Sequence, residues 1–491
     1  MKSKILYPLI CLTWLIVMAF GFYHHEIWRD EMRALSIAIT SPSIFHLPVY
    51  LQNEGHPILW YLFLKLGYNL YHSTSVLSIF SFIFASGICA IILFKSPFNI
   101  WVKIGLIFGY YCVYEYGINC RNYGISAFFL LLFAYQATKN KDFNFKAILY
   151  LIFAMHCNIY ASFASFILSI WYLNEHFSEL KKTKKLVLNS LLILVSFSLV
   201  IALVYPNKET VVVNHHPFNL DLILNTLNVS NGFNDYIPNW LKLNAYGISF
   251  FLFLSVLMFY KQPKVMIILI LILLFTSFFS LKIYSSQNRH QGIYFYTLIV
   301  FAWYYFPQLK AHWLKKNITS IIISFGIIIN LYITSTLLIK GKSKYVFNLN
   351  TNMSNSKEFG KWCTQNLNEN SLIIPEADYT MESVVYYDKR EFFIPRENRK
   401  GLYVHFTKEN KYEMSLNRLV EFTDSFNSLG KVCYLVFNQE IKSVDCNREF
   451  SYGKKFNYSK EYSELFLKDF KLIKVFNTNC WNEENYFVYK R

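Results

Sequence analysis

Long apolar runs fill the first two thirds of the chain and end well before its C-terminus. A helix of about 20 apolar residues spans the hydrocarbon core of a bilayer, and most of these runs approach that length. They cover residues 5–22, 75–95, 100–118, 122–138, 146–156, 158–174, 186–205, 245–260, 265–281, 291–307 and 317–340. The fifth run is too short to cross unaided. The pattern predicts an all-α polytopic membrane domain of about eleven transmembrane helices over residues 1–340.

The pattern changes after about residue 352 to short alternating elements. Amphipathic helical segments alternate there with short apolar strands. The helices are expected at 356–367, 381–390 and 417–426, and the strands at 371–376, 391–395, 431–437 and 470–476. This alternation predicts a soluble α/β domain over residues 341–491. It shows no catalytic constellation, so two roles stay open: a cap that helps to bind an acceptor, or a purely structural domain.

The composition supports a membrane protein and excludes a soluble enzyme. Hydrophobic residues make up 54% of the chain and charged residues only 16%, against about a quarter in soluble domains. Most of the excess that gives the net charge of +17 lies on lysines between the apolar runs. The charge therefore indicates membrane topology and not a nucleic-acid partner.

Segment 57–72 decides the sidedness of the loops. It is apolar but short, and Lys65 interrupts it. If it stays on the outer side as a surface or re-entrant helix, the lysine-rich loops collect on the inner side, as the positive-inside rule requires. If it spans, Lys95 and Lys103 move outside. The first arrangement predicts a multi-pass protein of a bacterial inner or plasma membrane, with a cytoplasmic N-terminus, a first outer loop at 23–56 and an extracytoplasmic C-terminal domain.

The arginines of residues 1–340 all fall on the outer side in this topology, whereas the inner loops use lysine. They are Arg29, Arg33, Arg121 and Arg289. Topology needs only positive charge, but a guanidinium also offers a planar fork that binds two oxygens of a phosphate or carboxylate. The asymmetry points to an outward-facing phosphate site, with chance in a lysine-biased sequence as the alternative. His290 follows Arg289 at the outer end of a span.

Loop 23–56 carries the densest candidate chemistry. Asp30 and Glu31 are adjacent in the segment RDEMRALSIAI, whose periodicity predicts a short helix lying on the membrane interface. Asp30 can cap that helix, and this structural role is the alternative to a catalytic one. Arg33 is expected on the exposed side of the helix. The loop ends in Glu54-Gly55-His56-Pro57, before an aromatic helix.

Two later segments add polar residues to the membrane domain. Arg121 and Tyr123 share one face of the loop that opens a span, and Glu115 just before it is expected to form a structural ion pair with Arg121. His156 lies between two apolar half-segments. His156 either binds substrate or forms a structural hydrogen bond between two helices.

Five stretches together resemble the GT-C superfamily of membrane glycosyltransferases, and within it the branch of protein O-mannosyltransferases and lipid A aminoarabinose transferases. The resemblance rests on an Asp-Glu pair in the first outer loop, an HP-plus-aromatic helix and an R-x-Y opening of a later span. The stretches are WRDEMRA at 28–34, EGHPILWYL at 54–62, RNYGISAFFLLL at 121–132, MHCNIYAS at 155–162 and NRHQGIYF at 288–295. The chain departs from the family at Ile58, where a second proline is frequent, and at Asn119, where a glutamate is frequent.

The resemblance implies a GT-C-like fold and transfer of a sugar from a polyprenyl-phosphate donor to a hydroxyl of a glycan, lipid or protein at the outer face. Asp30 is then the general base, with Glu31 beside it in the catalytic pair, and direct displacement would invert the anomeric centre. Cationic groups would bind the leaving phosphate. The donor-phosphate candidates are Arg289, Arg121 and Lys65, and the substrate-binding candidates are Glu54, His56, Tyr123, His156 and His290.

The resemblance makes no cofactor certain. Some members of the superfamily use a divalent metal, and Asp30 and Glu31 would ligate Mg²⁺ or Mn²⁺ here. Two other functions stay open, a glycan polymerase or ligase that uses a lipid-diphosphate oligosaccharide and a transporter of a lipid-linked glycan. The acidic residues lie at the outer ends of spans and not at the bilayer midplane, which argues against transport.

Overall fold

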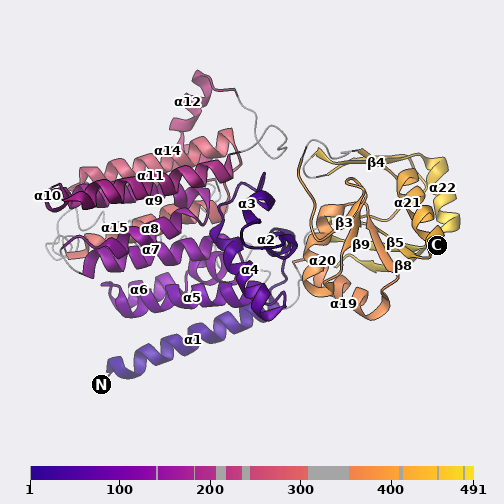
Figure 1. Cartoon of the computed structure of the whole chain (residues 1–491), viewed down its shortest axis with the longest axis horizontal. Coiled ribbons are helices and arrows are strands. Elements are labelled where there is room, and N and C mark those ends of the chain that lie inside the picture. The colour runs from indigo at the N-terminus through magenta and orange to yellow at the C-terminus, as the bar shows by residue number, and fades with distance from the viewer. Residues whose placement is uncertain are drawn as a thin grey trace.

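The computed structural model describes residues 2–139, 142–181, 183–205, 217–234, 244–307, 353–407, 413–450, 453–478 and 482–491. Two parts lie side by side, a helical N-terminal part and a C-terminal part of mixed α/β structure (Figure 1). This arrangement confirms the predicted fold class. The apolar run 317–340, and with it the predicted boundary between the domains, lies outside the described residues.

Among the described residues of the N-terminal part, four helices are long and apolar enough to cross a membrane. They are α1 (Lys2–His24), α5 (Val76–Lys95), α11 (Lys184–Val204) and α14 (Pro263–Lys282). Shorter helices lie at further predicted runs: α7 (Asn122–Lys139), α8 (Phe145–Met155), α9 (Ile159–Glu175), α13 (Ala245–Leu257) and α15 (Asn288–Tyr304). The connecting elements include α10 (Phe177–Leu180), α12 (Leu220–Leu227) and η2 (Val229–Gly232). The N-terminal part is thus a multi-pass membrane domain.

The predicted span 100–118 is two elements and not one helix. α6 (Ile100–Ile107) ends after about two turns, and a π-helix, η1 (Tyr111–Ile118), follows with all eight residues buried. Neighbouring helices surround this wider turn, and the Tyr116 hydroxyl donates a hydrogen bond to the Arg289 carbonyl at 2.7 Å. π-Helical turns are uncommon and occur frequently at functional sites. This one ties the segment before α7 to the start of α15.

The outer loop 23–56 folds into α2 (Arg29–Thr40) and the short α3 (Leu47–Tyr50), and α4 (Leu59–Tyr71) follows. The helix predicted at α2 is confirmed, and protein covers most of its surface. Seven of its 12 residues are buried, because it packs between α4 and α20 (Met381–Asp388) of the C-terminal part. α4 has 13 residues, about 20 Å of helix against a hydrocarbon core of about 30 Å. It is too short to span alone.

The C-terminal part is built on a four-stranded mixed sheet in the order β1-β5-β9-β8. β1 and β5 are parallel, whereas β9 is antiparallel to both of its neighbours. The strands are β1 (Ser371–Pro375), β5 (Val432–Phe437), β8 (Lys471–Phe476) and β9 (Tyr486–Lys490). The helices beside them are α19 (Ser356–Asn366), α20, α21 (Leu416–Ser428) and α22 (Lys460–Asp469). The predicted α/β alternation is confirmed.

Short strands that the sequence pattern mostly missed complete this part. A three-stranded sheet has the order β4-β7-β6, and β2 and β3 form an antiparallel pair. Their bounds are β2 (Phe392–Ile394), β3 (Arg399–Gly401), β4 (Glu413–Ser415), β6 (Cys446–Glu449) and β7 (Lys455–Tyr458), with 3₁₀ turns η4 (Asp378–Thr380) and η6 (Asn482–Glu484). Only β2 coincides with a predicted strand.

Alternate residues of the main sheet face two different cores, as the period of two in a strand requires. Ile373 and Val436 belong to a core that is continuous with the membrane domain and includes residues of α19 and α20. Leu372 and Leu435 belong to a second core with residues of α21 and α22. The C-terminal part is therefore attached to the membrane domain by apolar packing as well as by polar contacts.

A buried carboxylate lies at the end of β1. Glu376 directly follows the strand and is fully buried. Arg448 Nη2 lies 3.6 Å from Oε2. Burial outweighs the attraction of Arg448 and Arg396 and raises the pKa of Glu376 from 4.5 to about 7.

We expect Glu376→Gln to change the pH dependence of unfolding. A carboxyl group whose pKa is raised by folding stabilises the folded state most below pH 4.5, and this contribution is lost as the pH rises to about 7. The stability of the variant relative to wild type should therefore rise across this range, by up to roughly 3 kcal/mol, and then level off. Intrinsic fluorescence of the full-length protein during heating measures this difference. Glu461→Gln, which removes an exposed carboxylate of α22, should give a flat difference; a flat difference for Glu376→Gln would contradict the interpretation.

Candidate functional site

Asp30 lies among three arginines at the end of the membrane domain that packs against the C-terminal part. It is the second residue of α2, and its Oδ2 lies 2.5 Å from Arg121 Nη1 and 3.6 Å from Arg289 Nη2. Arg29 Nε lies 3.8 Å from Oδ1. Burial alone would raise the pKa of Asp30, but Arg121, Arg289 and Arg29 together hold it well below its ordinary value. The side chain keeps 22% exposure, so this carboxylate remains accessible.

Two helix starts bring the arginines to Asp30. Arg121 immediately precedes α7, and Arg289 is the second residue of α15. Both guanidiniums lie over the ring of Trp28, each with its carbon 5.9 Å from the ring centroid. Arg289 Nε is buried and has no hydrogen-bond partner among the described residues. Cation–π contacts hold the two cations in place without neutralising them.

Glu31 points away from Asp30 into the protein. Its carboxylate contacts His25 Nε2 at 2.9 and 3.0 Å and accepts hydrogen bonds from the backbone N–H of Trp28 at 3.0 Å and of Cys120 at 2.6 Å. The side chain is fully buried. Glu31 therefore fixes the first turn of α2 to the segment before Arg121, and its carboxylate has no open face for a substrate.

The residues around Asp30 do not fit a divalent metal. The two adjacent carboxylates do not converge, because Glu31 is occupied by His25 and two amides while Asp30 faces guanidiniums. In the described ranges, no group of three or more His, Cys, Asp or Glu side chains is placed to hold a metal ion. A hard cation would need several oxygen ligands, and positive neighbours oppose its binding.

Arg33 joins the outer loop to the C-terminal part and is not exposed as predicted. Its guanidinium binds Glu54 through two contacts of 2.6 and 2.9 Å, and it also contacts Glu382 at 2.8 Å and the Val404 carbonyl at 2.8 Å. The side chain is only 12% exposed, since its guanidinium lies over the ring of Phe406. The carboxylate of Glu54 is thus held in an ion pair, away from the position of a free substrate ligand.

Lys65 is separated from the arginines. It projects from α4, and its ammonium donates to the carbonyls of Ser41 at 2.5 Å and Ile39 at 3.4 Å. These carbonyls belong to the C-terminal end of α2, where a positive charge complements the helix dipole. Asp30 begins the same helix, about 15 Å away along its axis. The predicted contact of Lys65 with a donor phosphate at Arg121 and Arg289 has no support in this geometry.

His56 lies close to the two arginines and is held neutral. Burial, then the positive charges of Arg121 and Arg289, lowers its pKa to about 3. Its Nδ1 is buried and has no hydrogen-bond partner among the described residues. The preceding Gly55 has φ +69°, a left-handed conformation that glycine adopts without strain. A neutral imidazole can donate at one ring nitrogen and accept at the other.

The remaining predicted residues divide between the site and the scaffold. Tyr123 and His290 lie at the site, with ring centroids 5.6 Å apart, and His290 stacks on Tyr160 at 4.5 Å. The Nδ1 of His290 accepts a hydrogen bond from the Gln287 amide at 3.0 Å, which fixes the turn that carries Arg289. His156 instead bonds Ser196 on α11 at 3.0 Å. That contact supports its alternative role as a helix-to-helix hydrogen bonder.

Two features of the site were not anticipated from the sequence. The predicted ion pair of Glu115 with Arg121 is wrong, because Glu115 accepts hydrogen bonds from Tyr110 Oη at 2.5 Å and Asn119 Nδ2 at 3.2 Å. Trp28, which supports both arginines, was also missed. The available signal was its position directly before Arg29 and Asp30, where an aromatic ring would reach any cation paired with Asp30.

Comparison with known proteins gives one structural match. No family model matches the chain, and no curated protein matches it. The crystal structure of ArnT from Cupriavidus metallidurans bound to undecaprenyl phosphate aligns with 99% of this chain and 98% of that chain. The sequence identity is 11% and the TM-score is 0.45.

We expect Arg33→Lys to weaken the folded protein. A lysine ammonium cannot replace the bidentate contact with Glu54 while also holding Glu382 and the Val404 carbonyl, so the loss should be about 1–3 kcal/mol. Thermal unfolding of the full-length protein measures it. Arg418→Lys is the matched control, since Arg418 forms an exposed ion pair with Glu421 and lies over the ring of Phe422 at the surface, and such exposed contacts contribute little. Equal stability of the two variants would show that the Arg33 contacts do not hold the parts together.

Proposed function

We propose that the protein is a membrane glycosyltransferase that moves a sugar from a polyprenyl-phosphate donor to an acceptor hydroxyl at the outer face of the membrane. One observation carries the proposal: Asp30, a partly exposed carboxylate, lies between Arg121 and Arg289 where α2, α7 and α15 begin. The motif resemblance to GT-C glycosyltransferases supports the same reading. The donor, the acceptor class and the sidedness are part of the proposal.

The arginine pair suits the phosphate of the donor. Among the described ion pairs, Arg121 and Arg289 share the single carboxylate of Asp30, so their charges exceed the anion between them. Guanidinium groups bind phosphate oxygens bidentately, and a leaving lipid phosphate gains negative charge as the glycosidic bond breaks. Charge aimed at that oxygen therefore stabilises the transition state more than the ground state.

Asp30 is proposed as the general base. In the acceptor's attack, the hydroxyl oxygen bonds to the anomeric carbon, its proton passes to the Asp30 carboxylate, and the bond to the phosphate oxygen breaks with its electron pair. The depressed pKa makes Asp30 a weak base while both arginines face it. A donor phosphate competes for the same guanidinium N–H groups, and this competition would raise the pKa of Asp30. Donor binding would thus activate the base.

Neighbouring residues have supporting roles in this proposal. His56 is neutral and close to the arginines, so it can orient a hydroxyl of the sugar or the acceptor. Tyr123 and His290 form an aromatic wall beside Arg121 and Arg289. Glu31 is a positioning residue, because it acts on Asp30 only through the start of α2.

The place of the site favours transfer over transport. Asp30, Arg121 and Arg289 each stand at the start of a helix and not in the middle of one. Transporters of charged or lipid-linked substrates more often carry such groups near the bilayer midplane, on interrupted helices. A site at helix ends suits a reaction at headgroup depth.

We expect Asp30→Asn to lower sugar transfer by about 10²–10⁴-fold while donor binding persists, because the amide cannot accept the proton. Purified full-length protein is incubated with a panel of radiolabelled polyprenyl-monophosphate sugars and candidate acceptors, and donor turnover is followed. Asp221→Asn, also in the first turn of a helix but in α12, is the matched control for Asp30→Asn.

Arg289→Lys should raise the donor KM about tenfold, because lysine cannot make the bidentate contact with the donor phosphate. The same turnover assay, run over a range of donor concentrations, measures this KM.

Two outcomes would refute this assignment. Wild-type turnover by Asp30→Asn would remove Asp30 as the base. Turnover of lipid-diphosphate oligosaccharides alone, with none of the monophosphate donors, would identify a polymerase or ligase instead.

Sidedness has its own prediction. We propose that residues 341–491 are extracytoplasmic and that the end of α7 faces the cytoplasm. A cysteine introduced at Lys361 on α19 should react with an impermeant maleimide in intact cells, whereas one at Lys139 should react only after permeabilisation. Both positions are exposed, so access to the reagent and not burial decides the result. Labelling of the cysteine at position 139 from outside would reverse the topology.

A further inference from the structure

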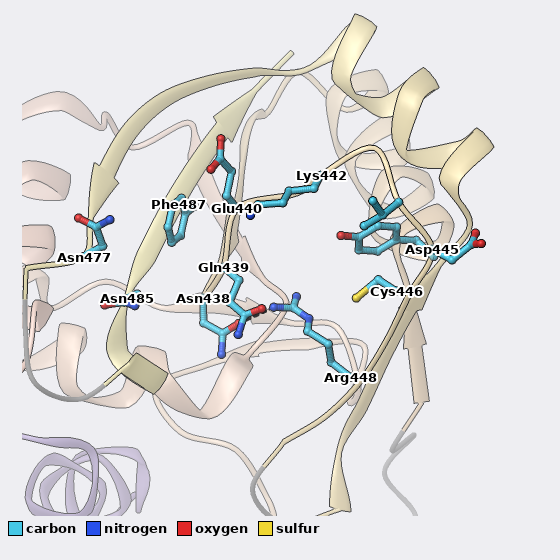
Figure 2. Close-up of a pocket in the computed structure, with 12 residues that line it drawn as sticks. Asn438, Gln439, Glu440, Lys442, Asp445, Cys446, Arg448, Asn477, Asn485 and Phe487 are labelled. Atoms are coloured by element: carbon cyan, nitrogen blue, oxygen red, sulfur yellow. Dashed lines mark hydrogen bonds between the residues drawn. The ribbon is translucent and has the colours of Figure 1, made fainter.

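A cleft in the C-terminal part lies outside the Asp30 site. It opens where β5 ends, between the β6-β7 edge and the start of β9, and has a volume of about 430 Å³ (Figure 2). Pockets for small ligands have volumes of about 300–1,000 Å³. Its lining includes Asn438, Gln439, Asn477, Asn485 and Phe487. The cleft therefore has the size of a binding site and an unusually high share of carboxamide side chains.

Two of these carboxamides have their oxygen atoms hydrogen-bonded within the protein, so that their NH₂ groups can donate to a ligand. Asn438 is 5% exposed, and its Oδ1 accepts a hydrogen bond from Arg448 Nη1 at 3.2 Å. The Oδ1 of Asn485 likewise accepts one from Asn355 Nδ2 at 3.2 Å. With each oxygen engaged, the Nδ2 groups of Asn438 and Asn485 are oriented donors. Figure 2 shows Arg448 directed toward Asn438 at the base of the cleft.

The rim adds carboxamides that can adapt to a ligand. Gln439 and Asn477 are exposed, and their side chains make no hydrogen bond within the part of the chain that the structure describes. A carboxamide both donates and accepts, as a hydroxyl does. The half-buried ring of Phe487 supplies an apolar surface between these polar groups. The carboxamides suit the hydroxyls of a sugar, and the aromatic ring suits the apolar C–H face of a sugar ring.

The charges of the cleft favour a neutral ligand. Lys442 and Arg448 are balanced by Glu440 and Asp445 along the same lining. Arg448 Nη2 also lies 3.6 Å from Glu376, so its charge is partly compensated inside the protein. An anion would meet carboxylates at the rim and would gain no net attraction.

We infer that this cleft binds a neutral carbohydrate chain, through its carboxamides and Phe487. Asn485 lies two residues after Glu483, whose carboxylate contacts Arg29 Nη1 at 3.0 Å, next to Asp30. A glycan bound there would therefore be held by the same loop that contacts the start of α2. That this glycan is the acceptor rests on the proposed function; its binding to the cleft does not.

The test measures binding to the full-length protein in lipid nanodiscs, because sugar-headed detergents would compete. The probes are fluorescent neutral oligosaccharides of glucose, mannose, galactose and N-acetylglucosamine, with a sulfated oligosaccharide and a neutral peptide of similar size for comparison. At least one neutral oligosaccharide should bind. The double variant Gln439→Ala/Asn477→Ala should weaken that binding about tenfold, as expected for lost hydrogen bonds between neutral groups.

Two further variants make the outcomes distinguishable. Asn427→Ala, at an exposed position of α21 near the opposite end of β5, should bind the probe like wild type. Asp30→Asn should also bind it fully, even where transfer is lost, so failure of the proposed reaction and failure of the cleft give different results. Absence of neutral-oligosaccharide binding at millimolar concentration, a preference for the sulfated probe or the peptide, or unchanged affinity in the double variant would each overturn the inference.

Discussion

The buried carboxylate of Glu31 is the interaction on which the site depends. It contacts His25 and accepts hydrogen bonds from the amides of Trp28 and Cys120, so it joins the first turn of α2 to the segment that leads into α7. A carboxyl group shielded from water is costly unless donors satisfy it, and here they do. The separation of Asp30 from Arg121 is set by this junction, because each lies next to one of the bonded residues.

The electrostatics of the site come from an excess of positive over negative charge around the largely buried side chains of Arg121 and Arg289. Two guanidiniums at the starts of different helices face one carboxylate, and the ring of Trp28 supports both cations without cancelling their charge. Charges attract more strongly where water is excluded, so an anion that displaces Asp30 would be held firmly. Burial first, and then the same positive field, lowers the pKa of His56 and keeps its ring neutral.

The sequence predicted what periodicity and motifs encode, and it failed where long-range packing decides. Apolar runs and α/β alternation located the main elements, and the arginine asymmetry together with the family resemblance selected Arg121, Arg289 and Asp30 as candidates, which the structure brings together. It could not show that Arg33 lies beneath the C-terminal part and binds both Glu54 and Glu382, because Glu382 is more than 300 residues away in the chain. The break of span 100–118 into α6 and a buried π-helix was likewise not apparent from its continuous apolar pattern.

The Arg33 cluster has a consequence for how such a chain can change over evolutionary time. One guanidinium satisfies a carboxylate of the outer loop, a carboxylate of α20 and a backbone carbonyl of the C-terminal part. A lineage that replaced or lost the C-terminal part would leave the Arg33 guanidinium without two of its partners, close to Asp30 in the same helix. The two parts are therefore constrained to be inherited together, and substitutions at positions 33, 54 and 382 should arise as correlated sets.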